Sequence, residues 1–240
     1  MSRVIRRKVA VPPQPERLAA RPRIDRLLAD LIEENGLVWV TATAGAGKTT
    51  AVTQALPLID RRVAWLTLDD TDAAPGRLVT YVEAALSAHV KSVEGVATRA
   101  LAARLPHAEA AGLMVEAVGD VRVVLVIDEL ERLADSRSAL AVIEALVRYA
   151  PPQMRIVLIS RRELPVAGAA LGASVTVAEA DLAFRTDEAA EALERAGRAD
   201  IDPAEAVEAT GGWVAGVLFE AWRSAEHVVG MGGEADALHG

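Results

Sequence analysis

Short apolar runs that alternate with helical segments constrain the fold of this chain more than any other feature. Four runs are rich in Val, Ile and Leu and a weaker fifth follows; they cover residues 37–42, 62–68, 121–128, 154–160 and 174–179. Runs of this length without polar alternation are typical of strands buried on both faces. Helical patterns such as 74–90 and 136–150 separate them. The alternation predicts an α/β fold with a mainly parallel five-stranded sheet flanked by helices.

The residue pattern before and after the five predicted strands differs from the pattern within them. Residues 1–22 contain four prolines and a basic cluster (Arg3, Arg6, Arg7, Lys8), which favours an extended lead-in whose charges are solvated, with a nucleic-acid contact as the alternative. The α/β domain is expected over residues 23–180. Residues 181–228 have short helical patterns with N-caps expected at Thr186 and Asp202, so they indicate a small helical domain. The Gly-rich segment 229–240 is expected to be a flexible tail.

Composition excludes several kinds of site. The chain has no cysteine, which rules out disulfides and thiolate metal sites. Its formal net charge of -8 lacks the basic footprint of nucleic-acid binding, so we expect no direct DNA binding by this chain. No apolar run approaches the ~20 residues of a membrane span, and the start lacks a signal-peptide core. We therefore expect a cytoplasmic protein without a membrane partner.

The stretch from Ala42 to Thr49, "ATAGAGKT", has the spacing of a phosphate-binding P-loop, with Ala in place of the first Gly. A predicted strand precedes it and a helical segment follows, which is the context that the motif requires. The residues expected to contact nucleotide here are Ala44, Gly45, Ala46, Gly47, Lys48 and Thr49. Backbone amides would surround the phosphates, Lys48 would reach the β and γ phosphates, and Thr49 would ligate Mg²⁺. The sequence predicts a site for ATP or ADP with Mg²⁺.

Two acidic residues follow the buried run 121–128. Asp128 ends that run and is expected to hold Mg²⁺ through water. Glu129 leaves the same strand end in another direction, so it is placed to polarise a water that attacks the γ phosphate. The alternative for Glu129 is an ordinary cap on the helix that begins after it.

Further charged residues follow two other strands. Arg161 comes directly after residues 154–160, and the carboxyl ends of parallel strands meet at one edge of a sheet. Arg161 is therefore expected to contact the γ phosphate, with a solvated basic turn as the alternative. The group Asp69, Asp70 and Asp72 is interpreted as a solvated loop that caps the helix starting near Pro75, rather than as a metal site.

Several segments within residues 11–222 carry a joint pattern: "RPRIDRLLADL", "ATAGAGKTT", "VAWLTLDDTDAAPGRLVTYVEAAL", "VLVIDELERL", "RIVLISRRELP", "EADLAFRTDEAAEAL" and "TGGWVAGVLFEA". Together they resemble the signal-transduction ATPases with numerous domains (STAND), in particular the ATPase module of MalT-type, LuxR-type large bacterial transcriptional regulators. The resemblance implies the strand order 5-1-4-3-2. It also implies a switch that is closed with ADP, assembles with ATP and is reset by hydrolysis. Sensor and DNA-binding modules would then lie on further segments or on partner chains.

The resemblance also assigns residues. It matches Lys48, Thr49 and Thr50 to the phosphates, Asp128 and Glu129 to magnesium and water activation, Arg161 to a sensor arginine, Arg21, Pro22 and Arg23 to the adenine side, and Gly212 with Trp213 to the helical-domain signature. Val214 stands where many relatives have a proline that packs on the base, and Glu129 stands where many have a second aspartate.

The sequence thus favours an ATP- or ADP-binding regulatory switch in transcription, with slow Mg²⁺-dependent hydrolysis and nucleotide-controlled self-association. Two alternatives remain open at this point. One is an autonomous AAA-like ATPase, and the other is an interaction scaffold that holds ADP permanently.

Overall fold

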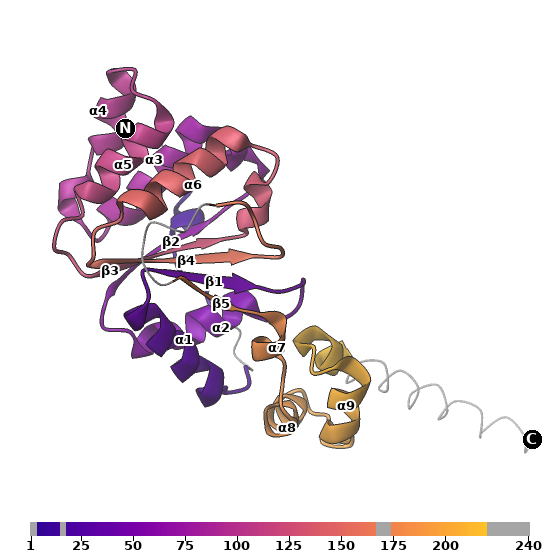
Figure 1. The fold of residues 1–240 in the computed structure, drawn as a ribbon. Helices are drawn as coiled ribbons and strands as arrows, with labels where there is room; N and C mark the ends of the chain where they lie inside the picture. The colour runs from indigo at the N-terminus through magenta and orange to yellow at the C-terminus, as the bar shows by residue number, and fades with distance from the viewer. Residues whose placement is uncertain (1–3, 15–17, 167–173, 220–240) are drawn as a thin grey trace, which may run out of the picture.

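The computed structural model describes residues 4–14, 18–166 and 174–219, and a five-stranded parallel sheet forms its centre (Figure 1). The strands are β1 (Leu37–Thr41), β2 (Arg62–Thr67), β3 (Val123–Asp128), β4 (Met154–Ser160) and β5 (Ser174–Val177). Their order is β2-β3-β4-β1-β5, and every paired neighbour is parallel. This confirms the expected order 5-1-4-3-2, which is the same order counted from the opposite edge.

Helices cover both faces of the sheet. The α-helices are α1 (Pro22–Glu34), α2 (Lys48–Ala55), α3 (Pro75–Ser87), α4 (Val96–Ala102), α5 (His107–Glu116), α6 (Arg137–Tyr149), α7 (Glu179–Leu182), α8 (Thr186–Arg195) and α9 (Pro203–Thr210). Short 3-10 helices are η1 (Arg6–Val9), η2 (Leu56–Leu58), η3 (Asp70–Ala73), η4 (Lys91–Val93) and η5 (Leu130–Leu133). In Figure 1, α3 to α6 lie on one face, α1 and α2 on the other, and α7 to α9 beside the carboxyl edge.

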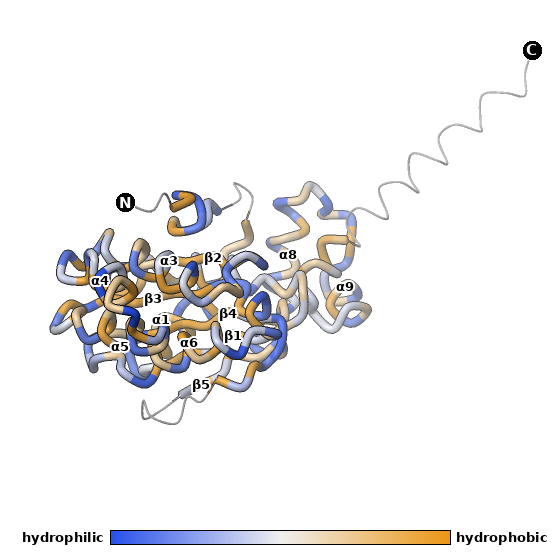
Figure 2. Tube along the Cα trace, turned by 90° about the horizontal axis from the view of Figure 1, so that it is seen from above, coloured by the Kyte–Doolittle hydropathy of each residue, from blue (hydrophilic) through white to orange (hydrophobic). Residues whose placement is uncertain are grey.

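The central strands are buried because their side chains serve two cores. In β3, Val123, Leu125 and Ile127 join the apolar cluster beneath α3 to α6, whereas Val124 and Val126 join the cluster beneath α1 and α2. A strand with apolar residues at every position therefore has both faces covered, as the sequence predicted. The colouring of Figure 2 shows hydrophobic residues gathered along these strands. Asp128 is the polar exception, and it lies at the carboxyl end, where the site is expected.

A third, smaller apolar cluster connects the lead-in to the carboxyl-terminal helices. Its buried members are Ala19, Phe184, Ala189, Ala192, Leu193, Ala206 and Val217. Residues 214–219 are helical, and the part of the predicted helical domain after residue 219 and the predicted tail 229–240 lie outside the described residues. None of the helices in the described ranges has both the length and the apolar composition of a membrane span.

We expected the charges of the basic lead-in and of the acidic loop to be solvated, and this expectation was wrong for Lys8 and Asp72. Lys8 is almost buried, forms an ion pair with the fully buried Asp72, and lies 3.0 Å from an oxygen of Asp69. Its ammonium also lies 4.6 Å from the ring centre of Tyr81. A buried carboxylate requires a counter-charge, and the lead-in supplies it. Asp69 caps η3 rather than α3, because its side chain accepts from the Thr71 amide.

The two expected helix caps had different outcomes. Asp202 caps α9, where its carboxylate accepts from the amides of Ala204 and Glu205 at 2.7 and 3.2 Å. Thr186 is instead the first residue of α8, and Arg185 occupies the N-cap position. The Arg185 amide donates to the carboxylate of Glu188 at 3.1 Å, so a side chain in the first turn of α8 supplies the acceptor for the amide at the N-cap.

Candidate functional site

The loop between β1 and α2 has the backbone conformation that its glycines predict. Gly45 and Gly47 have φ angles of 81° and 80°, a region that residues with a Cβ rarely adopt. Gly47 is the N-cap residue of α2, so the loop leads directly into the amino end of that helix. Free amides and the helix dipole make such an end suited to anions. The loop therefore has the geometry of a phosphate site.

Lys48 lies across this loop. Its ammonium donates to the carbonyl oxygens of Ala42 and Thr43 at 2.7 and 2.9 Å. Burial lowers the pKa of Lys48, while the carboxylates of Glu131 and Glu129 oppose that shift. The lysine therefore lies at the loop, close to the acids of the neighbouring strand end.

Thr49 and Asp128, the two residues predicted to bind Mg²⁺, lie next to each other. The Thr49 hydroxyl donates to Oδ2 of Asp128 at 2.9 Å, and the Glu129 amide donates to Oδ1 at 2.9 Å. Asp128 is buried, and burial raises its pKa to about 6 in spite of these two hydrogen bonds. A hydroxyl beside a carboxylate is a suitable donor set for Mg²⁺, which uses few protein ligands and keeps several waters. The residues present therefore fit this ion.

Glu129 has a backbone conformation that is uncommon outside glycine. Its φ angle is 60°, in the left-handed region, where strain often accompanies a functional role. Its carboxylate lies 3.3 Å from Nη2 of Arg161 and 3.4 Å from Nη2 of Arg132. Glu129 occupies the N-cap position of η5, but its side chain makes no capping hydrogen bond there, so the carboxylate does not act as an ordinary helix cap.

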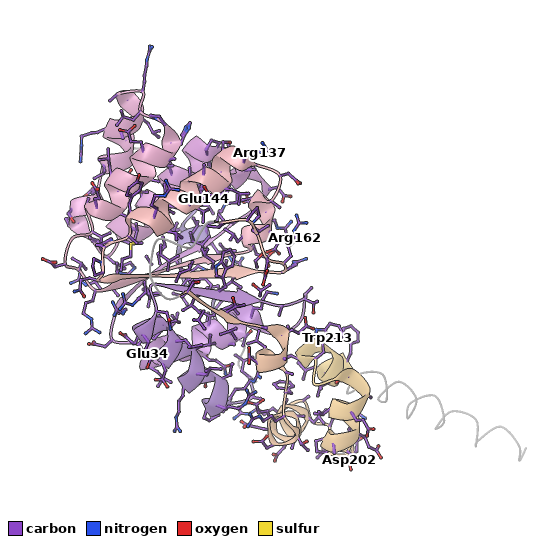
Figure 3. The ribbon with its side chains drawn as sticks, viewed as in Figure 1. Glu34, Arg137, Glu144, Arg162, Asp202 and Trp213 are labelled. Atoms are coloured by element: carbon purple, nitrogen blue, oxygen red, sulfur yellow. The ribbon has the colours of Figure 1, made fainter. Side chains whose placement is uncertain are left out.

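Arg161 is held by two acids, one of which the sequence interpretation missed. Nε of Arg161 lies 2.8 Å from Oε1 of Glu131, and the Arg161 amide donates to Oε2 of Glu131 at 3.1 Å. Glu131 is mostly buried. Its position two residues after Glu129 is the sequence signal that could have identified it as part of the site. Figure 3 shows the neighbouring Arg162 near the carboxyl edge of the sheet.

Residues 213–215 contact the P-loop from the helical side. Nε1 of Trp213 donates to the Ala44 carbonyl at 3.1 Å, and the Ala215 amide donates to the Gly45 carbonyl at 3.0 Å (Figure 3 labels Trp213). A Cβ added to Gly47 would lie 3.6 Å from a methyl group of Val214. Two hydrogen bonds and close packing thus join this segment to the loop.

Gly212 enables this approach. Its φ angle is 75°, and an added Cβ would lie 2.5 Å from the carbonyl oxygen of Phe184. The Phe184 amide in turn donates to the Gly212 carbonyl at 2.8 Å. Only glycine fits both the conformation and the close backbone approach. The residue orients the segment that carries Trp213.

Arg21 and Arg23 join the lead-in to the segment before α8. Nη2 of the buried Arg21 donates to the Leu182 carbonyl at 2.7 Å and lies 3.3 Å from Glu188. Arg23 lies 3.0 Å from the same carboxylate. Burial lowers the pKa of Arg21, and Glu188 opposes the shift. Pro22 is the first residue of α1, a position that suits its fixed φ.

A cavity of about 300 Å³ lies beside these residues and reaches the P-loop. Arg21 and Phe184 line it on one side, Thr50 and Gln54 of α2 on another, and Val214 from the helical segment. The cavity also borders Gly45 and Gly47. The sequence interpretation placed the adenine side at residues 21–23, and of these three residues Arg21 lines the cavity.

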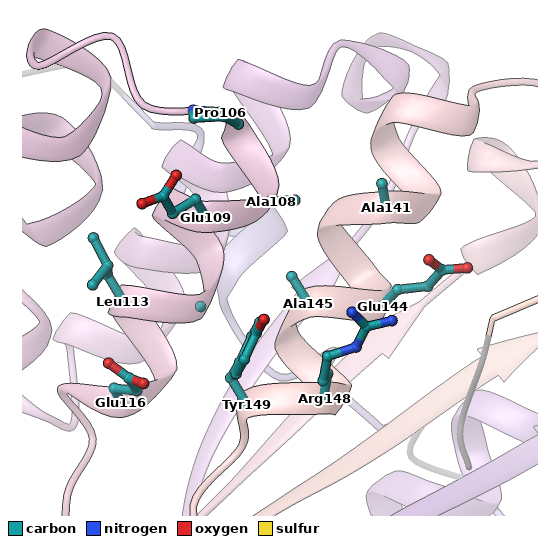
Figure 4. A pocket seen from close by; sticks show the side chains of 11 residues that line it. Pro106, Ala108, Glu109, Leu113, Glu116, Ala141, Glu144, Ala145, Arg148 and Tyr149 are labelled. Atoms are coloured by element: carbon teal, nitrogen blue, oxygen red, sulfur yellow. The ribbon is translucent and has the colours of Figure 1, made fainter. Parts of the chain in front are cut away.

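A larger hollow of about 590 Å³ lies elsewhere, between α5 and α6 (Figure 4). Leu113 and Tyr149 line it together with small residues and charged residues that include Glu109 and Glu144. It shares no lining residue with the P-loop cavity. It is therefore separate from the candidate site.

Solved structures show the same fold. A STAND protein with a tetratricopeptide repeat sensor from Pyrococcus horikoshii is 15% identical, with a TM-score of 0.55 over 85% of this chain and 30% of that chain. A Walker-type ATPase of Pyrococcus abyssi is 17% identical, with a TM-score of 0.50 over 90% of this chain and 74% of that chain. The Drosophila ORC structure bound to DNA is 17% identical, with a TM-score of 0.52 over 95% and 60%.

The present chain thus spans less than a third of the STAND protein and somewhat more than half of the ORC chain. No curated protein sequence matches it. The family described as AAA domain matches residues 31–165, more than half of the chain, and this range contains the P-loop, Asp128, Glu129 and Arg161. The chain belongs to the AAA domain family of P-loop ATPases.

Proposed function

We propose that this chain is an ATP- or ADP-binding switch module that hydrolyses ATP slowly with Mg²⁺. The observation that carries the proposal is the 2.9 Å hydrogen bond between Thr49 of the P-loop and Asp128 of β3, beside Lys48. Bound Mg²⁺ would neutralise phosphate charge and polarise the γ phosphate. Thr49 and Asp128 would hold the ion, the latter through water, and Lys48 would contact the β and γ phosphates.

Glu129 and Arg161 would complete the chemistry. Glu129 would orient and polarise the attacking water, and Arg161 would contact the γ phosphate. Their distance of 3.3 Å supports this pairing, because both side chains lie at the carboxyl edge where the phosphates would end. Moving Arg161 from the carboxylate to a phosphate would release Glu129 for its role as base.

The remaining nucleotide contacts follow from the loop and the cavity. The proposed contacts are Ala44, Gly45, Ala46, Gly47 and Thr50 at the phosphates, Arg21, Pro22 and Arg23 on the adenine side, and Gly212 with Trp213 from the helical side. The proposed organisation is a lead-in (1–22), the nucleotide-binding domain (23–180), a helical domain (181–228) and a tail (229–240). The cavity of about 300 Å³ between lead-in, α2 and Val214 supports this division.

The switch would use the contact between residues 213–215 and the P-loop. A nucleotide that enters the loop changes the surroundings of the Ala44 and Gly45 carbonyls, which Trp213 and Ala215 engage. We propose that this couples nucleotide state to self-association. The motifs that resemble MalT-type regulators support a role in transcription regulation in the cytoplasm, with sensor and DNA-binding modules outside this chain.

Two other functions have support of their own. The AAA domain match favours an autonomous ATPase with turnover stimulated by assembly. The engagement of Glu129 by Arg161 and Arg132 favours a scaffold that holds ADP without turnover. Turnover and nucleotide exchange separate these functions: a switch turns over slowly and exchanges, a motor turns over rapidly, and a scaffold does neither.

Calorimetric titration with ADP and Mg-ATP tests the proposal, after denaturation of a sample has identified any nucleotide bound on purification. We expect the parent chain to bind both ligands and Lys48→Ala to lose at least ~100-fold in affinity while it stays folded, since Lys48 would contact phosphate and its ammonium makes hydrogen bonds, among the described residues, only to two carbonyl oxygens of the loop. Light scattering with each nucleotide then tests self-association. Unchanged affinity in Lys48→Ala would overturn the proposed site.

A further inference from the structure

The hollow between α5 and α6 is a groove with a partly exposed apolar lining (Figure 4). Small buried residues form its floor, among them Gly112 of α5 and Ala145 of α6. The ring of Tyr149 lies so close to Gly112 that an added Cβ would lie 2.9 Å from Cδ2 of the ring. Leu113 and Tyr149 remain 40% and 47% exposed. The groove therefore presents apolar area that is available to a partner.

Charged side chains on both helices give the groove a negative character. Glu109 and Glu116 of α5 and Glu144 of α6 line it, and Arg148 is the basic residue of the lining (Figure 4). None of these four side chains forms an ion pair within the ranges that the structure describes. A complementary occupant carries an apolar side chain next to positive charges.

The lead-in of the same chain presents this combination. Ile5 is 54% exposed, and Arg6 and Arg7 beside it are exposed as well. Neither arginine forms an ion pair with another described residue. The ion pair between Lys8 and Asp72 fixes the segment on its own chain, where η1 contacts β2 and α3. We call Ile5, Arg6 and Arg7 the basic knob, and none of them lines the groove of its own chain.

The basic knob and the groove are complementary in charge and lie on different parts of the chain. Two copies of a chain with a formal net charge of -8 repel each other, so a contact between copies needs a local pairing of opposite charges. These two surfaces supply one. We propose that the basic knob of one copy binds the α5–α6 groove of a second copy, with Ile5 on the apolar floor and the two arginines at the glutamates. This inference rests on the self-association in the proposed function and assigns its surfaces.

The geometry determines what kind of assembly results. The contact joins two different surfaces, so one end of a pair keeps a free knob and the other a free groove, and further copies can add. A contact built on three knob residues is smaller than the ~1,600 Å² of a standard interface, so it is weak alone. Its charges are exposed, so salt screens them. We therefore expect head-to-tail association that weakens with ionic strength.

Sedimentation velocity measures association of the full chain without nucleotide, with ADP and with Mg-ATP. The knob variant, Arg6→Gln with Arg7→Gln, and the groove variant, Glu109→Gln with Glu116→Gln, each remove charge from one of the two surfaces. We expect each to associate at least about fivefold more weakly than the parent. An equimolar mixture should restore parent-like affinity, because the groove variant keeps an intact knob and the knob variant an intact groove. The mixture should stop at pairs, since the outer ends of such a pair are the two altered surfaces.

Two controls on α1 reproduce the change in net charge away from both surfaces. Arg26→Glu matches the knob variant and Glu34→Lys matches the groove variant, and both positions are exposed. We expect both controls to associate like the parent. Raising NaCl from about 0.05 to about 0.5 M should weaken association of the parent severalfold, and that measurement needs no variant.

The outcomes separate this inference from the proposed function. Parent-like association of either surface variant overturns the inference alone, and so does a mixture that fails to restore association. Equal weakening in the controls would attribute the effect to net charge and overturn the inference, as would parent association that persists unchanged at high salt. A parent that stays monomeric in all three conditions overturns the inference together with the self-association in the proposed function. Nucleotide affinity, measured by calorimetry on the same samples, tests the nucleotide site independently.

Discussion

Two regions of the molecule meet at the P-loop, and they are held in place by different means. Asp128 is the last residue of β3 and Glu129 follows it, and the residues of β3 are buried between two apolar cores. Residues 213–215 reach the loop from a segment that packs on a small apolar cluster, and they contact it through two backbone carbonyls. Regions with few buried apolar contacts separate at lower cost than central strands. We therefore expect Asp128 and Glu129, the fixed side of the site, to keep their positions. Residues 213–215, the adjustable side, should move more easily relative to the loop.

The largest expected effect tests the fixed side. Glu129→Gln keeps size and one acceptor oxygen but removes the negative charge that would polarise water. We expect nucleotide affinity to remain and single-turnover phosphate release from Mg-ATP to fall by about 100- to 10,000-fold. Glu163→Gln, at an exposed position beyond β4, is the matched control and should behave like the parent. Parent-like phosphate release by Glu129→Gln would remove Glu129 from the mechanism.

The next prediction concerns the cost of burying Asp128. Its pKa is about 6 when folded, above the ordinary value of 3.8, so the folded state binds the extra proton between these values. The contribution of this group to the free energy of unfolding therefore falls by about 3 kcal/mol as the pH rises from about 4 to 6. We expect denaturant titrations without Mg²⁺ to show this loss in the parent and not in Asp128→Asn. Identical pH profiles would contradict it, and added Mg²⁺ should weaken the dependence in the parent.

A smaller effect is expected on the adjustable side. Gly212→Ala places a Cβ against the Phe184 carbonyl at a φ of 75°, so we expect a local cost of about 2 kcal/mol or more. Gly211→Ala is the matched control, because its φ is 62° but no atom lies within 4 Å of the added Cβ. Hydrogen exchange should accelerate in residues 203–219 more in Gly212→Ala than in the control, while β3 stays protected. Equal acceleration in β3 would show that the two regions unfold together.

The smallest effect concerns a single hydrogen bond. Trp213→Phe keeps the ring but removes the indole N–H that donates to the Ala44 carbonyl. Trp213 is partly exposed, so we expect a change of about 1 kcal/mol or less in the contact between the segment and the loop. ADP dissociation, measured by stopped flow, should accelerate by no more than about fivefold. A change of 100-fold would contradict the prediction, because it exceeds what the loss of one partly exposed hydrogen bond can cause.

The sequence predicted the elements whose pattern is set by burial. Val123 to Ile127 form an uninterrupted apolar run, and such a run has one stable placement, inside a sheet covered on both faces. The P-loop was predicted because its glycines, lysine and threonine have fixed spacing between a strand and a helix. The strand order came from the resemblance, and the structure confirms it.

The remaining contacts could not be predicted because they depend on tertiary partners. Lys8 has the local signature of a solvated arm, and only the folded chain brings it to Asp72, 64 residues away. The cap expected at Thr186 failed because Glu188 satisfies the amide of Arg185 instead. Sequence patterns indicate which residues are buried and how motifs are spaced. Ion pairs and hydrogen bonds between distant residues can be seen only in the folded structure.

Gly45 has a consequence for how this chain can vary. Its φ of 81° belongs to the phosphate loop, and its missing Cβ leaves room for Ala215, whose own Cβ would lie 2.7 Å from an added one. Two separate demands thus fall on one position. Shortening the facing side chain, as in Ala215→Gly, could relieve the contact but not the backbone strain. Ala215→Gly should therefore recover only part of the stability that a Cβ at position 45 removes. The loss that remains measures the cost of the left-handed backbone conformation that the loop requires there.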